Sequence, residues 1–182
     1  MKVLVAYYSL SGYTESLAKA IVVALGGATS GGGGPAGDAA GSPPSGFRVE
    51  LFEVVPAKPY SYFSAGVKGV TQAMAGTIVE LAGEPPTDEG FEALVVLSPT
   101  WGWMSSPPIR SFVAALPDGA GRPAVVGVTH AGGPIGSFDR LAGLVEERGY
   151  RVLERLSVFC YDRAAIRAAA ELTAAALRAQ TG

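Results

Sequence analysis

With 182 residues, 48% of them hydrophobic and 16% charged, the sequence is typical of one globular domain over residues 1–182 rather than of a disordered chain. The formal net charge is −2 and basic residues do not cluster, which argues against nucleic-acid binding and against attachment to an anionic membrane surface. The single cysteine, Cys160, excludes an internal disulfide, and no apolar run is long enough for membrane insertion, so we expect a cytoplasmic protein.

The first predicted strand, over residues 2–8, leads into a short loop rich in hydroxyl groups. Its apolar run without alternation is typical of a strand buried on both faces of a parallel sheet. A helix follows, with Leu17, Ile21 and Leu25 at helical spacing. A strand, a tight loop and a helix start direct backbone N–H groups and the positive end of the helix dipole at one point, where a phosphate can bind. The predicted phosphate-binding residues are Ser9, Leu10, Ser11, Gly12, Tyr13 and Thr14.

Three segments of different character precede the next buried strand. Residues 26–46 are rich in glycine and proline and carry one charge, which predicts a flexible surface insertion. Residues 47–54 alternate apolar and polar side chains, as a half-exposed strand at a sheet edge does. Residues 60–83 combine helical apolar spacing with glycines. We expect a helical excursion there that either covers the ligand or forms an interface.

The rest of the chain alternates buried strands with amphipathic helices. Strands are predicted over residues 91–98, 123–129 and 150–160, and a helix follows each of them. Such alternation predicts a five-stranded parallel sheet with helices on both faces. Ligands of these sheets bind beyond the carboxyl ends of the strands. The loops at residues 9–14, 99–106 and 130–137 each follow a strand, so we expect them to meet at that edge.

These three loops resemble those of the flavodoxin family. Residues 8–14, Tyr-Ser-Leu-Ser-Gly-Tyr-Thr, resemble its phosphate loop, which runs hydroxyl-x-hydroxyl-Gly-x-Thr. Residues 98–103, Ser-Pro-Thr-Trp-Gly-Trp, resemble the loop along the isoalloxazine ring, and residues 129–133 fall at the third flavin loop. The resemblance implies a flavodoxin-like three-layer α/β sandwich, a sheet of order 2-1-3-4-5 and a non-covalent FMN. The further cofactor contacts that it implies are Pro99, Thr100, Trp101, Gly102, Trp103, His130, Ala131, Gly132 and Gly133.

Several single residues keep two interpretations at this point. Trp101 and Trp103 are either core tryptophans or aromatic faces against a flavin ring. His130, the only histidine, is either a hydrogen-bonding residue at a strand end or a protonated imidazole beside the ring. Cys160 is interpreted as an inert core residue. No catalytic side chain and no metal site are predicted.

Three functions are compatible with these features. The first is an FMN-binding redox protein that carries electrons through the flavin to a redox partner protein. The second is an FMN-dependent quinone or azo reductase that uses NAD(P)H, which the short third loop favours by leaving the ring face open. The third is a flavodoxin-fold interaction module without FMN. The sequence is also compatible with a homodimer.

Overall fold

The computed structural model describes residues 1–27, 46–86 and 90–181. The insertion predicted over residues 26–46 lies outside the described part of the chain, apart from its end residues. In chain order the elements are β1 (Lys2–Tyr7), α1 (Tyr13–Ala24), β2 (Arg48–Glu53), α2 (Tyr62–Ser64), η1 (Ala65–Gly69), α3 (Val70–Met74), β3 (Ala93–Trp101), β4 (Met104–Ser105), α4 (Pro107–Ala115), β5 (Pro123–His130), α5 (Ser137–Glu147), β6 (Arg151–Phe159) and α6 (Arg163–Arg178).

The longer strands form a parallel sheet in the order β2-β1-β3-β5-β6. The short β4 stands off this path and pairs antiparallel with the end of β3. When β4 is left out and the five remaining strands are numbered in chain order, the strand order is the predicted 2-1-3-4-5. Both the α/β class and the strand order are therefore confirmed. The exposed and half-buried residues of β2 confirm that it is an edge strand.

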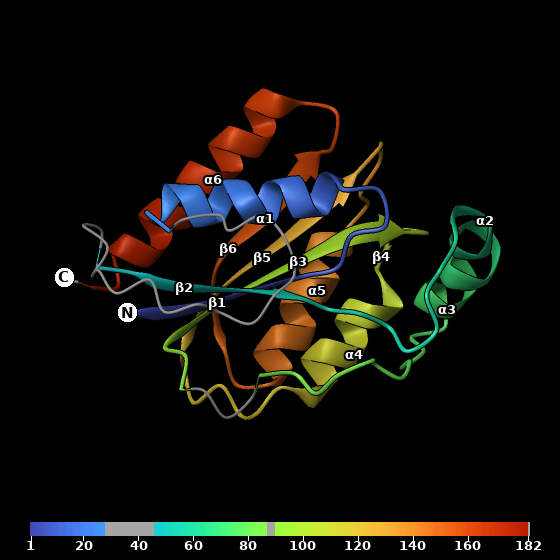
Figure 1. Ribbon diagram of the computed structural model, residues 1–182, viewed down its shortest axis with the longest axis horizontal. Helices are drawn as coiled ribbons and strands as arrows, with labels where there is room; N and C mark the ends of the chain where they lie inside the picture. The colour runs from blue at the N-terminus through green and yellow to red at the C-terminus, as the bar shows by residue number, and fades with distance from the viewer. Residues whose placement is uncertain (28–45, 87–89, 182) are drawn as a thin grey trace.

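Helices cover both faces of the sheet, with α1 and α6 on one face and α4 and α5 on the other (Figure 1). The side chains of β1 alternate between the two layers: Val3 and Val5 pack in the core beneath α1 and α6, and Leu4 packs in the opposite core. All three are buried, which explains why the strand is uniformly apolar. Each such side chain stabilises the fold by roughly 1.5–3 kcal/mol.

The predicted excursion is helical over residues 62–74, where it consists of α2, the π-helical η1 and α3, and residues 75–83 are not helical. It lies beyond the carboxyl ends of the strands (Figure 1) and packs on the end of β3. Gly69 makes this packing close, because a Cβ built there would lie 2.6 Å from Cζ3 of Trp101. On its outer side Phe63 and Val67 are exposed. Among residues 1–27, 46–86 and 90–181, no helix is long and apolar enough to cross a membrane.

The second predicted loop, residues 99–106, is a hairpin rather than a loop. Strand β3 continues to Trp101, which pairs with Met104 across the two residues Gly102 and Trp103. Both of these residues have positive φ, +56° and +63°, as the two central residues of a type I′ turn require. The expected end of the strand at residue 98 was therefore wrong, since the chain reverses only three residues later.

Candidate functional site

The loop between β1 and α1 presents a set of backbone N–H groups without acceptors. Gly12 is the N-cap of α1, with φ +81° and no side-chain cap. Its own N–H donates to Ser9 Oγ at 3.0 Å, which closes the loop on itself. In the described part of the chain, the N–H groups of Leu10, Ser11, Tyr13 and Thr14 donate to no acceptor. At the positive end of a helix such a set is suited to a phosphate.

The three predicted hydroxyl groups of this loop have different environments. Ser11 is exposed, and Ser9 accepts the hydrogen bond from Gly12 and keeps its own proton. Thr14 is buried, and its Oγ1 lies 2.7 Å from Oγ1 of Thr129 at the end of β5. Only one of these two hydroxyls donates in that bond, so the other keeps a proton for a ligand. The bond also ties the first loop to the strand that leads into the third.

The two tryptophans of the hairpin differ sharply in burial. Trp101 is only 8% exposed, and its indole packs edge-on against Tyr8, with ring centroids 5.7 Å apart, and against Tyr60, at 5.0 Å. Gly69 contacts the same indole. The Trp101 side chain thus packs as a core residue, which favours the core interpretation over an indole face against a ring, and its backbone remains at the edge. Burial, followed by Tyr60 and Glu53, raises the pKa of Tyr8 to about 12, so its hydroxyl stays protonated.

Trp103 is the exposed tryptophan, with 51% of its surface accessible at the tip of the hairpin. A positive φ in a bulky residue costs about 1–3 kcal/mol, and such strain is found chiefly at functional positions. Gly102 before it admits no side chain, because a Cβ there would lie 2.7 Å from Cγ1 of Val70. The hairpin therefore holds the Trp103 indole at the mouth of the predicted site.

The third loop begins at His130, whose ring lies at the end of β5. Its Nε2 lies 3.2 Å from Ser157 Oγ, and its centroid lies 6.0 Å from that of Phe159. Burial lowers the pKa of His130, so the imidazole is neutral at pH 7. The lowered pKa and the contact with Ser157 favour the hydrogen-bonding interpretation of His130. Ala131, Gly132 and Gly133 follow as exposed backbone.

Buried polar atoms without a hydrogen-bond partner indicate whether the residues at this edge of the sheet fit a flavin nucleotide. Ser105 Oγ and His130 Nδ1 are buried and lack a hydrogen-bond partner among the described residues, so each can accept or donate one to a ligand. At Gly12, Gly132 and Gly133 a Cβ would meet nothing within 4 Å, so the backbone there is open to approach. Together with the N–H groups of the first loop, these residues fit FMN.

Side chains that the sequence did not single out bring the second and third loops together. Arg140 Nη1 donates to the carbonyl oxygens of Trp103, at 3.1 Å, and Ile135, at 3.2 Å. A hollow of about 290 Å³ lies here, lined by Met74, Gly102, Trp103, Met104, Ile135 and Arg140. Met74 comes from the excursion and Arg140 from α5, so no pattern within the loops could have revealed either. Within the described ranges, no group of three or more His, Cys, Asp or Glu side chains could hold a metal ion.

Comparison with known proteins rests on structure alone, because no family model and no curated protein sequence matches the chain. A flavoprotein of Bacteroides eggerthii superposes with a TM-score of 0.66 at 19% identity, covering 95% of this chain and 98% of its own. The oxidised Flavodoxin 2 of Bacillus cereus gives 0.57 at 20% identity and 99% coverage of both chains. The chain has the flavodoxin-like fold. A flavoprotein of Lactobacillus acidophilus solved in complex with FMN also matches, with a TM-score of 0.60 at 16% identity, covering 86% of this chain and 92% of its own.

The flavodoxin-like fold explains why the three loops converge. In the sheet order β2-β1-β3-β5-β6, the strands that precede these loops, β1, β3 and β5, are direct neighbours. Thr100 Oγ1 lies 3.4 Å from Ser137 Oγ at the start of α5, which links the second loop to the end of the third. The predicted site residues therefore lie along one edge of the sheet, with Trp101 turned into the core and Trp103 turned out.

Proposed function

We propose that this protein binds FMN non-covalently and acts as an electron carrier. The observation that carries the proposal is the set of N–H groups without acceptors at the start of α1, in a loop that contains no carboxylate. A phosphate dianion there replaces the missing acceptors and lies at the positive end of a helix dipole. Bound FMN would supply the redox chemistry, and the chain supplies binding, orientation and electrostatics.

Different residues along this edge of the sheet would contact different parts of the cofactor. Leu10, Ser11, Tyr13 and Thr14 would hold the phosphate through N–H groups, with the Ser11 hydroxyl as an additional donor. The Trp103 side chain would shield the ring from water. Ser105 Oγ and His130 Nδ1 would satisfy polar groups of the ligand.

An absorption spectrum of the purified protein is the direct test. We expect a yellow protein that releases FMN on denaturation, identified by mass spectrometry. A colourless protein that takes up no added FMN would contradict the proposal.

The Ser11→Ala variant tests the phosphate loop separately. Ser11 is exposed and its side chain makes no hydrogen bond to other described residues, so folding should be unaffected. FMN affinity should fall by about 10- to 100-fold, because a hydrogen bond to a charged group contributes roughly 1.5–3 kcal/mol. Riboflavin, which lacks the phosphate, is the control ligand. An equal loss for both flavins would place Ser11 away from the phosphate.

The hollow beside Trp103 supports a second candidate, an FMN-dependent quinone or azo reductase that uses NAD(P)H. Met74, Trp103, Met104 and Ile135 give it an apolar lining that suits a planar acceptor better than water. Anaerobic mixing with NADPH or NADH decides between the two candidates. Bleaching of the flavin absorbance, followed by turnover with a quinone, would support the reductase, and a flavin that stays oxidised would support the carrier.

A further inference from the structure

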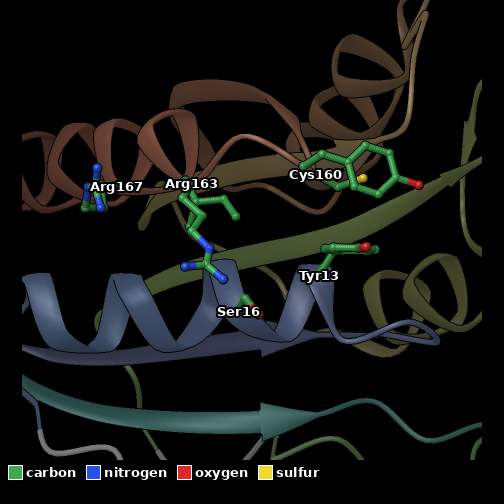
Figure 2. A pocket seen from close by; sticks show the side chains of 7 residues that line it. Tyr13, Ser16, Cys160, Arg163 and Arg167 are labelled. Carbon is green, nitrogen blue, oxygen red and sulfur yellow. The ribbon is translucent and has the colours of Figure 1, made fainter.

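A second groove lies between the N-terminal ends of α1 and α6, on the outer side of the phosphate loop. Its volume is about 550 Å³. Tyr13 and Ser16 on α1 form one wall, and Arg163 and Arg167 on α6 form the other. Figure 2 shows the Arg163 side chain extending from α6 towards α1, above Ser16. No part of the proposed flavin site, other than the Tyr13 side chain, lines this groove.

The two arginines of the groove are cations without a protein anion. They are one helical turn apart, so both lie on the same side of α6. Both are exposed, and neither forms a hydrogen bond or ion pair with another described residue. By contrast, Arg155 pairs with Glu146 at 2.9 Å.

Two carboxylates near the groove, Glu15 and Asp162, are already engaged. Glu15 binds Lys19 at 2.6 Å. Asp162 accepts from the N–H groups of Ala164, at 2.8 Å, and Ala165, at 3.1 Å, and so caps α6. Because Asp162 already caps the N-terminal end of α6, the positive charge in the groove comes from the two guanidinium groups.

The floor and one end of the groove are apolar and aromatic. The Tyr13 and Tyr161 rings meet edge-on with centroids 5.1 Å apart, and Tyr13 stands at the start of α1, next to the phosphate loop. Ile166 lines the groove, and so does Cys160, which is buried as predicted. Burial raises the pKa of this thiol, so it remains uncharged. A simple inorganic anion would leave this apolar surface uncovered.

We propose that this groove binds a nucleoside phosphate, with the phosphate on Arg163 and Arg167 and the base against Tyr13 and Tyr161. Guanidinium groups bind phosphate oxygens in pairs. Aromatic rings offer a favourable surface to a planar base. The volume lies in the range of small-molecule sites. The proposal is independent of flavin binding, because the phosphate of FMN is assigned to the N–H groups of the first loop.

Calorimetric titration of the full chain with 5′-ADP and 2′,5′-ADP tests the proposal, both with and without added FMN. At least one of the two should bind, and binding should weaken at least ten-fold in the Arg163→Ala/Arg167→Ala double variant, whose FMN affinity should be unchanged. Adenosine and inorganic phosphate should each bind more weakly than the nucleotide. Both replaced side chains are exposed, so circular dichroism should show an unchanged fold.

The matched control is the Arg151→Ala/Arg155→Ala double variant, which removes the same charge from β6 and should keep nucleotide affinity within two-fold. Three results would overturn the proposal. The first is no nucleotide binding to the unmodified chain. The second is an equal loss in both double variants, which would indicate unspecific attraction. The third is displacement of FMN by the nucleotide, which would place it in the flavin site.

Discussion

Trp103 combines backbone strain with an exposed aromatic side chain, and substitution by glycine removes both, with two effects that are measured separately. In the Trp103→Gly variant the positive φ is no longer strained, so the free energy of unfolding should rise by about 1 kcal/mol. FMN affinity should fall, because the side chain at the mouth is lost. Urea unfolding of the apoprotein and flavin titration measure the two effects.

The same measurements on a neighbour provide the control. Gly102→Ala should lower stability, because its Cβ would lie 2.7 Å from Val70 Cγ1. If Trp103→Gly lowered stability and left flavin binding unchanged, both the strain and the role assigned to Trp103 would be wrong.

His130 should give the protein a pH-dependent stability in mildly acidic solution. Burial lowers its pKa in the folded state, so between that pKa and the unfolded value of about 6.5 the unfolded chain binds more protons. The free energy of unfolding should therefore fall as the pH drops through this window. His130 is the only histidine, so its ring protons in an NMR titration report the folded pKa directly. A midpoint above 6.5 would contradict the prediction, and His130→Gln should remove the histidine's contribution to the slope.

At the scale of elements, two glycines of the excursion should respond in opposite directions to the same change. Gly69→Ala places a Cβ 2.6 Å from the Trp101 ring, and such overpacking typically costs 1–3 kcal/mol. Gly66→Ala meets nothing within 4 Å, so the better helix propensity of alanine should stabilise by up to about 1 kcal/mol. Thermal unfolding of both variants measures the difference. Similar effects at both positions would mean that the excursion does not dock on Trp101.

Elements with a local signal could be predicted from the sequence, and elements that depend on distant contacts could not. The uniform apolar run of β1 and the Asp162 cap of α6 are local features, and the structure contains both. The hairpin could not be predicted from a local signal, because tryptophan is rare in the left-handed conformation that Trp103 adopts. The position of Trp101 in the core depends on Tyr60 and Gly69, which are more than thirty residues away in the sequence. An aromatic residue in a motif does not reveal which face it presents until its neighbours are known.

At the scale of the whole molecule, FMN should stabilise the fold by mass action. A ligand that binds only the folded chain contributes about 2.7 kcal/mol at a concentration one hundred times its Kd. For a domain of this size that corresponds to a rise in Tm of roughly 5–11 °C. Differential scanning fluorimetry with and without FMN measures the shift. No shift at saturating FMN would contradict binding to the folded state, and 5′-ADP at the same concentration serves as a comparison.

The packing of the excursion on the hairpin has a mechanical consequence. Gly69 lies against Trp101 at the base of the hairpin, and Gly102 at its tip lies against Val70 and Met74. The two segments therefore contact each other at both ends and form one rigid unit, although they are separated in sequence. Any widening of the hollow beside Trp103 has to lift the excursion with the tip. The rate at which a bulky acceptor enters should then follow the stability of this unit, and Gly69→Ala should change that rate without touching the hollow itself.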